Sequence, residues 1–348
     1  MNPLTKLNMI MISLLKLNKK NTLTFNQSLG LLLLILICLY LFFFVFQKFI
    51  FQEGQIPQTP IIIVNLCTDL CGLGNQLFRY AAALGLAAKH AQNHTICIFG
   101  LQYPSIFPSH ARSRLNQHID IIAPWSNLVL NKCPDWVGSF HLTKLQYVLN
   151  TFSSKYMDVF EPPHSTYVPF PLIKPSKSLL VNGCMQSFKY FDSIFLSQKP
   201  FFRLKQQNAA NLWIHHHQID TVIHVRRGDK IYDHSPIVPV EYYEKAMQRL
   251  PKTAKILVCT DDATWVRSQS IFENTTLYSK DPGFDMALIA AATETVIIGI
   301  GTFAWWGAFL SQAKQVYYYP IQYQGNLVNG YVEADYIPSQ WIPISPFP

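Results

Sequence analysis

The sequence predicts an α/β protein with two α/β domains behind an N-terminal transmembrane helix. Its last third alternates short β-branched runs with helical stretches, the order that forms a parallel, doubly wound sheet. A separate strand–helix–strand unit begins at residue 61, with glycines in the turn between its first strand and its helix. An uncharged apolar segment at residues 29–46 precedes both regions. We therefore expect the two domains at residues 61–205 and 206–348.

The apolar segment is long enough to cross a lipid bilayer. It has eighteen residues, mostly Leu, Ile and Phe, and neighbouring apolar residues extend it to position 50. Gln47, Lys48 and bulky aromatic residues follow it, whereas a cleaved signal peptide would continue with small residues. By the positive-inside rule, the lysines before it place the N-terminus in the cytosol (Lys6, Lys16, Lys19 and Lys20). We expect a cytosolic tail at 1–28, a signal anchor at 29–50 and a stem at 51–60, in a single-pass type II topology.

The composition excludes some classes of function. Of the 348 residues, 49% are hydrophobic and 14% aromatic, which is enough for a large core and unlike a disordered chain. The formal net charge is +8, but residues 54–348 hold only 23 basic and 19 acidic residues. That excess is too small to indicate nucleic-acid binding, and a local basic pocket for a phosphorylated ligand fits better.

The cysteines and glycosylation sequons agree with a secretory compartment. Six cysteines follow the apolar segment and permit up to three disulfides, with the pairing open: Cys67, Cys71, Cys97, Cys133, Cys184 and Cys259. Zinc is the weaker alternative, because no second pair of ligands follows the first two cysteines at a suitable spacing. Asn93 and Asn274 begin N-x-S/T sequons and are the expected glycosylation sites.

The first strand–helix–strand unit contains a candidate anion site. We expect a strand at 61–67, the turn C-G-L-G-N-Q-L-F at 71–78, a helix to about residue 90 and a strand at 96–99. Glycines in such a turn expose backbone N–H groups at a helix start, where anions bind. Gly72 and Gly74 are equally explained as ordinary turn residues. Asn75 and Gln76 either cap the helix or bind a sugar hydroxyl.

Apolar patterning predicts the remaining elements. Residues 100–205 are irregular and rich in proline and aromatic residues, with a strand leading into a short helix at 181–191. Beyond them we expect strands at 221–225, 255–259, 276–278, 295–300 and 315–319, and helices at 240–250, from 263 and at 285–293. Three adjacent histidines at 215–217 cannot all face one metal ion, so we favour a solvated helix end there.

A run of ten residues at 221–230, T-V-I-H-V-R-R-G-D-K, is the strongest local signal. Its β-branched part predicts a buried strand that ends at Arg226 and Arg227. Paired guanidinium groups suit a dianionic ligand, because each presents a fork of donors that keeps its charge. Asp229 is placed to hold one of the arginines. The alternative is an ordinary strand end with a solvated basic turn.

A second anion site is expected at Gly301 and Thr302. A glycine followed by an N-capping hydroxyl opens a helix whose free N–H groups and dipole favour anions. Phe303 could contact a nucleobase, whereas packing is the favoured role of Trp305 and Trp306. Because ligands bind at the carboxyl ends of parallel strands, we expect these residues to lie at the same sheet edge as both arginines.

The adjacent carboxylates Asp261 and Asp262 raise the question of a metal ion. Aspartate pairs hold a divalent cation on a diphosphate in many sugar-nucleotide enzymes. Two fixed arginines and a helix N-terminus neutralise the same diphosphate without an ion. We therefore expect no metal, and assign both aspartates to positioning an arginine, the ribose or the base.

Several motifs together resemble a known family. They are H-x-R-R-x-D at 224–229, G-L-G-N-Q-L-F at 72–78, a glycine-glutamine-phenylalanine stretch at 183–191, T-D-D at 260–262, D-M-A-L-I at 285–289 and I-G-T-F-A-W-W-G-A-F-L at 300–310. In this order the chain resembles the α-1,2-fucosyltransferases of glycosyltransferase family 11. It is similar, more loosely, to the α-1,6- and protein O-fucosyltransferases. The resemblance spans roughly residues 61–320.

This resemblance implies two Rossmann-like domains of the glycosyltransferase B type, with GDP-fucose held mainly by the C-terminal one. It implies inversion at the anomeric carbon and no cofactor or metal requirement. The acceptor would be the 2-hydroxyl of a terminal β-galactoside on a glycan, and the site of action the Golgi membrane with a luminal catalytic domain. Alternatives are a fucosyltransferase of another linkage, or an inactive membrane-tethered protein that binds glycans.

The resemblance also assigns roles to residues. Arg226, Arg227 and Asp229 would be catalytic, with both arginines on the donor diphosphate. The other expected donor-binding residues are His224, Asp261, Asp262, Asp285, Gly301, Thr302, Phe303, Gly74 and Asn75. The general base stays open among Asp229, Asp233, His234 and Glu241, because a base is defined by hydrogen-bond geometry.

Overall fold

The computed structural model describes residues 61–66, 71–90, 95–99, 118–121, 157–163, 165–174, 176–191, 202–232, 236–320, 322 and 331–347. Residues 59–348 group into one compact unit. The predicted tail, anchor and stem, the sequon at Asn93 and the base candidates Asp233 and His234 lie outside the described residues. Within those residues, no helix combines the length and apolar character that crossing a membrane requires.

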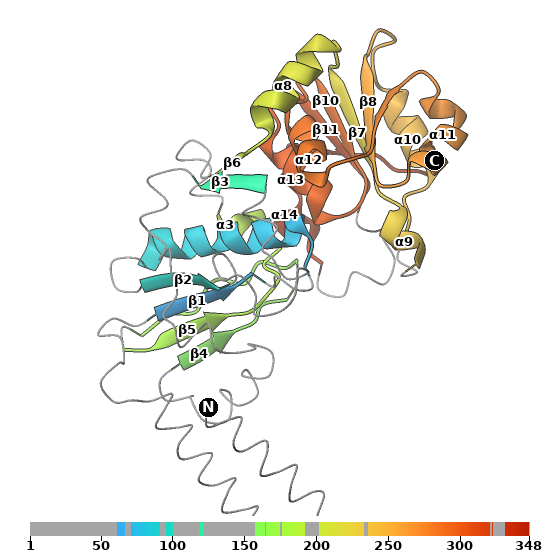
Figure 1. Cartoon of the computed structure of the whole chain (residues 1–348). Coiled ribbons are helices and arrows are strands. Elements are labelled where there is room, and N and C mark those ends of the chain that lie inside the picture. Colours follow the sequence, from blue (N-terminus) through green and yellow to red (C-terminus); the bar gives the residue numbers. More distant parts are fainter. Residues whose placement is uncertain are drawn as a thin grey trace, which may run out of the picture. The chain divides into compact units, whose positions relative to one another are not determined.

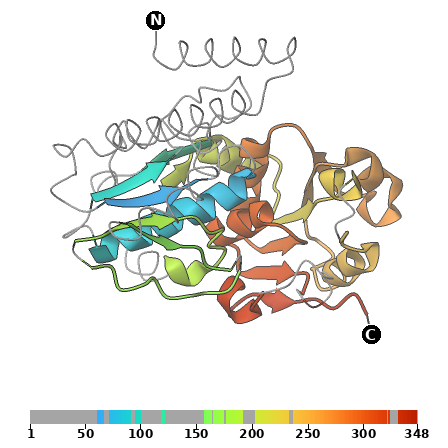
Figure 2. The same cartoon turned by 90° about the horizontal axis from the view of Figure 1, so that it is seen from below.

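The first sheet has four parallel strands in the spatial order β2-β1-β5-β4 (Figure 1). They are β1 (Ile61–Asn65), β2 (Thr95–Phe99), β5 (Ser178–Val181) and β4 (Met157–Phe160). Helix α3 (Leu73–His90) joins β1 to β2 and packs on both strands. Its run of alanines is buried, which lets the helix approach the sheet closely. Figure 2, turned by 90°, shows α3 (cyan) lying along these strands.

The second sheet has six parallel strands in the order β12-β11-β10-β7-β8-β9. Their bounds are β7 (Thr221–Val225), β8 (Ile256–Thr260), β9 (Thr276–Tyr278), β10 (Thr295–Ile298), β11 (Gln315–Tyr318) and β12 (Ile342–Pro343). The chain runs outward from β7 through β8 to β9, then returns to the other side of β7 with β10. The strand order therefore reverses between β7 and β10, and such a switch point is where open α/β sheets bind ligands.

Helices cover both faces of the second sheet. One face carries α8 (Gln207–His216), α12 (Pro282–Ala290) and α13 (Thr302–Leu310), and the other carries α10 (Val240–Met247) and α11 (Ala263–Ser268) (Figure 1). Short elements complete the description: α9 (Gly228–Tyr232), α14 (Glu333–Tyr336), the 3₁₀ turns Phe188–Tyr190 and Ser270–Phe272, and the antiparallel pair β3 (Ile119–Ile121) and β6 (Phe202–Leu204).

An aromatic cluster joins α3 to α13. The Phe78 ring lies 4.6 Å from that of Trp305 and 5.1 Å from that of Trp306, between ring centroids. Both tryptophans are almost completely buried, and the Trp305 indole N–H donates to the carbonyl of Tyr336 at 2.8 Å. The packing role predicted for the tryptophans is confirmed. This cluster sets the distance between the starts of the two helices, where the site lies.

The cysteines and histidines complete the comparison with the sequence. Cys71 and Cys97 are disulfide-bonded, whereas Cys184 and Cys259 are free thiols. The option of three disulfides is therefore wrong, and two is the maximum for the six cysteines that follow the apolar segment. The histidines at 215–217 are exposed at the end of α8, as predicted for a solvated helix end. Asn274 is exposed in the turn before β9, and its glycosylation stays a prediction.

Candidate active site

A cavity of about 820 Å³ opens where the starts of α3, α12 and α13 meet the end of β7. Its walls combine backbone turns with a few polar and charged side chains: Gly72, Leu73, Gly74, Asn75, His118, Ser165, Gln186, Arg226, Lys230, Asp281, Pro282, Ile300, Gly301, Thr302, Phe303, Tyr331 and Tyr336. A second cavity, of about 680 Å³ beside α8, contains none of the predicted site residues. The first cavity is the candidate active site.

The two neighbouring arginines occupy different environments. Arg226 lies on the cavity wall. Arg227 packs its guanidinium over the Trp265 ring, 4.1 Å from the centroid, and its Nε lies 3.5 Å from Oδ2 of Asp262. Arg227 is not among the residues that line the cavity within the described part of the chain. Only one of the two predicted phosphate ligands therefore faces the cavity.

The predicted carboxylates hold the turn that follows β7. Oδ1 of Asp261 accepts hydrogen bonds from the backbone N–H groups of Arg227 and Gly228, at 2.8 and 3.0 Å. Asp262 caps α11 by accepting from the N–H of Trp265 at 3.0 Å. The described residues contain no cluster of three or more His, Cys, Asp or Glu that could hold a metal ion. Asp229 falls in α9, and its side chain lies outside the described part.

Helix α13 begins at the cavity and presents its N-terminus there. Gly301 is the N-cap, with a φ of 105° that side chains disfavour, and its ideal Cβ would lie 3.4 Å from Nη1 of Arg226. The expectation that Thr302 caps the helix is wrong, because its hydroxyl donates to Oδ1 of Asn75 at 2.7 Å. The first N–H groups of α13 therefore have no side-chain cap and are available to an anion, which the helix dipole also favours.

The starts of α3 and α13 touch through backbone. A Cβ added at Gly74 would come within 2.4 Å of the Thr302 carbonyl carbon and 2.6 Å of the Phe303 nitrogen. A Cβ at Gly72 would meet no atom within 4 Å. The two glycines of the predicted turn therefore have different roles: Gly74 permits the close approach, and Gly72 is an ordinary turn residue.

Two titratable side chains, one in β7 and one in α12, have shifted pKa values. His224 is buried in β7 beside Phe303, with 5.4 Å between the ring centroids. Burial lowers its pKa to about 4; the Asp261 charge opposes this shift and the Arg226 charge adds to it, so the imidazole is neutral at pH 7. For Asp285 in α12, burial, then the charges of Asp281 and Asp261, raise the pKa to about 7.

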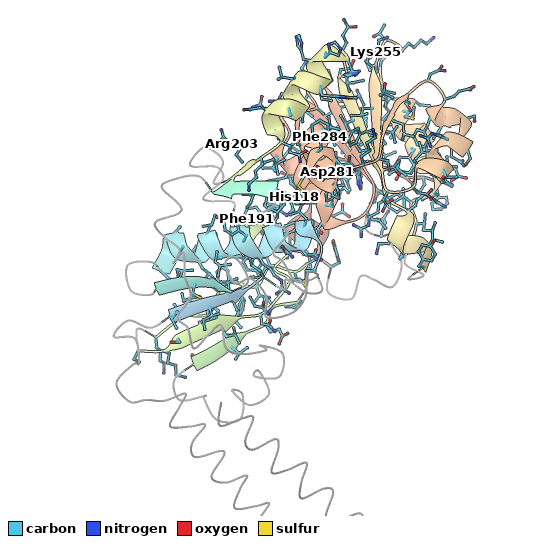
Figure 3. The ribbon with its side chains drawn as sticks, in the orientation of Figure 1. His118, Phe191, Arg203, Lys255, Asp281 and Phe284 are labelled. Carbon is cyan, nitrogen blue, oxygen red and sulfur yellow. The ribbon has the colours of Figure 1, made fainter. Side chains whose placement is uncertain are left out.

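The structure also places residues at the site that the sequence did not indicate. His118 and Asp281 lie together on the cavity wall (Figure 3), and a Cβ at Gly283 would come within 2.2 Å of Nδ1 of His118. Burial acts to raise the pKa of Asp281. Hydrogen bonds from Gln206, Phe284 and Gly283 and the nearby His118 outweigh it and leave that pKa lowered. Ser165, Tyr331 and Tyr336 come from segments without a readable period, whereas Lys230 ends the 221–230 run and Gln186 lies within the 183–191 stretch.

In a parallel α/β fold, an arginine and a helix N-terminus that meet at a switch point form an arrangement suited to a phosphorylated ligand. A sequence model described as glycosyl transferase family 11 matches residues 68–345, which is most of the chain. The chain belongs to glycosyl transferase family 11.

Individual relatives show how far the likeness extends. The O-antigen biosynthesis glycosyltransferase WbnK of Escherichia coli is 26% identical over 275 residues, covering 69% of this chain and 88% of WbnK. Among solved structures, the fucosyltransferase NodZ from Bradyrhizobium matches with a TM-score of 0.41 and 15% identity, over 77% of this chain and 97% of NodZ. A NodZ α-1,6-fucosyltransferase soaked with GDP-fucose matches with a TM-score of 0.42, 16% identity and the same coverage.

Proposed function

We propose that this glycosyltransferase transfers fucose from GDP-fucose to the 2-hydroxyl of a terminal β-galactoside on a glycan, with inversion. The observation that carries the proposal is the meeting of Arg226 with the N-terminus of α13 on one cavity wall. Together they supply a fixed cation and several backbone N–H donors for a diphosphate. The fucose donor and the α-1,2 linkage rest on the family and on the motif resemblance around these residues.

In this mechanism the bond between the fucose C1 and the β-phosphate oxygen breaks through an oxocarbenium-like transition state, and GDP leaves. The acceptor hydroxyl attacks C1 from the opposite face and passes its proton to a general base. Negative charge grows on the β-phosphate. Arg226 and the first N–H groups of α13 stabilise that charge because they are already oriented towards it. Arg227 and Asp261 act indirectly, by holding the turn that presents Arg226.

The nucleoside end of the donor lies along the carboxyl edge of the second sheet. Phe303 offers an aromatic face to the cavity, and the buried His224 packs beside it. No metal is required in this scheme, since Arg226 and the helix N-terminus carry the diphosphate charge. We further propose that the chain acts at the Golgi membrane as a single-pass type II protein, through the apolar segment at 29–46.

The test uses the detergent-solubilised full chain with GDP-fucose and lactose, in EDTA. Release of GDP together with an α-1,2-linked product is the expected result, and Arg226→Ala should lower the rate about 10²-fold or more, by analogy with the loss of an oxyanion donor. A product of another linkage would correct the acceptor assignment alone. GDP binding without transfer to any galactoside, or a rate that requires a divalent cation, would contradict the proposal.

A further inference from the structure

The amide of Asn75 is held in one orientation at the cavity wall. Its Oδ1 accepts two hydrogen bonds, from the Thr302 hydroxyl at 2.7 Å and from Nε2 of Gln186 at 2.9 Å. Within the described part of the chain, its Nδ2 group donates to no protein atom. Because Asn75 lines the cavity, that NH₂ group is available to an oxygen atom of a bound ligand.

Gln186 is itself fixed from the other side. Oε1 of Gln186 accepts from the Ser165 hydroxyl at 3.0 Å, and Ser165 is completely buried. The hydrogen bonds therefore run in one direction, from Ser165 to Gln186 to Asn75, and they orient both amides.

The backbone around Gln186 shows that its position is built into the fold. Met185, immediately before it, has a φ of 49°, a left-handed conformation that non-glycine residues disfavour. Ser187, immediately after it, donates to the backbone carbonyl of Asp335. Lys189 pairs with the Asp335 carboxylate at 2.6 Å. Strain of this kind persists where the surrounding contacts over-determine the backbone, and it concentrates at functional sites.

We infer that Gln186 is a positioning residue for the transfer reaction, which aims the Asn75 NH₂ group at the substrate by holding Oδ1 of that amide. The inference rests on the proposed function, because the ligand oxygen belongs to the sugar nucleotide or its acceptor. Without Gln186, Oδ1 of Asn75 keeps only the Thr302 hydroxyl, and the amide turns more freely. A misplaced donor of this kind costs roughly 10- to 10²-fold in rate.

A double-mutant cycle on the detergent-solubilised full chain tests this role. GDP-fucose and lactose are the substrates, and kcat is measured for Gln186→Ala, Asn75→Ala and the double variant. We expect each single variant to lose roughly 10- to 10²-fold in kcat with little change in the KM for lactose. The double variant should be no slower than Asn75→Ala, because Gln186 acts only through that amide.

Two further variants separate positioning from packing. Gln186→Glu keeps the size of the side chain but replaces the N–H donor with a carboxylate oxygen that repels Oδ1 of Asn75, so it should lose kcat as Gln186→Ala does. The matched control is Gln207→Ala, a part-buried glutamine that bonds Asn211 and the carbonyl of Ala287 away from this cavity. Its kcat should equal that of the wild type. If Gln186→Ala fails to fold, Ser165→Ala enters the same cycle and should show a smaller loss of kcat that also disappears in the Asn75→Ala background.

Two results would overturn the inference alone: an active wild type in which the losses of Gln186→Ala and Asn75→Ala multiply, or a Gln186→Glu variant with wild-type kcat. An inactive wild-type chain that also fails to bind GDP would overturn the proposed function, and this inference with it. The two failures are thus distinguished by the wild-type rate.

Discussion

Gly74→Ala tests whether the contact between the starts of α3 and α13 is required for activity. The added Cβ would meet the Thr302 carbonyl carbon at 2.4 Å and the Phe303 nitrogen at 2.6 Å, both backbone atoms that cannot rotate away. Since carbon contacts settle near 3.5 Å, the helix starts must separate by roughly 1 Å. The hydrogen bond from Thr302 to Asn75, now 2.7 Å, would then exceed hydrogen-bonding distance.

For Gly74→Ala we expect a small change in stability and a large change in rate. Overpacking costs about 1–3 kcal/mol, but alanine is favoured over glycine in a helix by about 1 kcal/mol, so the melting temperature should fall by only a few degrees. A 1 Å displacement at a reacting centre lowers the rate by up to about 10²-fold. Initial rates of GDP release from GDP-fucose, with Gly72→Ala as the matched control, measure the difference. Equal rates for the two variants would refute the reasoning.

Two further predictions concern buried titratable groups. Because the pKa of Asp285 is raised to about 7, its contribution to stability is present below about pH 4 and is lost as the pH rises through 7. Asp285→Asn, which stays neutral, should therefore raise the urea midpoint at about pH 8 far more than at about pH 5, and an equal increase at both would contradict this. Burial raises the pKa of the Cys259 thiol, which makes this cysteine unreactive in the folded chain. Iodoacetamide, with the sites read by peptide mass spectrometry, should label the half-buried Cys184 in the native chain and Cys259 only after unfolding. Equal labelling of both cysteines in the native chain would contradict the burial of Cys259.

Most elements with a clear apolar run could be predicted from the sequence. The strands at 221–225 and 276–278 have the predicted bounds, and the helix after the glycine turn ends at His90 as expected. The predicted helix at 285–293 begins earlier, at Pro282, because Asp281 caps it and Pro282 occupies its first turn. D-P-G reads equally as a turn or as a helix start, and only the hydrogen bond from the Phe284 N–H to Asp281 decides between them.

The sequence predicted the chemistry of the site better than it predicted which residues form the site. The motif residues Gly74, Asn75, Arg226 and Thr302 do meet at one cavity. The bonds that orient them join positions far apart in the chain, such as Thr302 to Asn75 and Gln186 to Asn75. A single sequence carries no signal for such pairs, because their register depends on how two separate sheets pack. His118 was missed for the same reason.

The different environments of Arg226 and Arg227 follow from strand geometry, which gives a last prediction. Successive strand residues face opposite sides, so Arg226 shares the α13 side with His224, whereas Arg227 shares the α11 side with Val225. Arg227 therefore cannot replace a lost Arg226.

We expect Arg226→Ala to lose about 10²-fold in kcat with little change in melting temperature. Arg227→Ala should instead lose about 1–3 kcal/mol of stability, from its Trp265 and Asp262 contacts, with a smaller loss of rate. Calorimetric melting and GDP-release rates on both variants separate the two roles. Equal rate losses would mean that both guanidiniums reach the diphosphate, and that the turn after β7 rearranges when the donor binds.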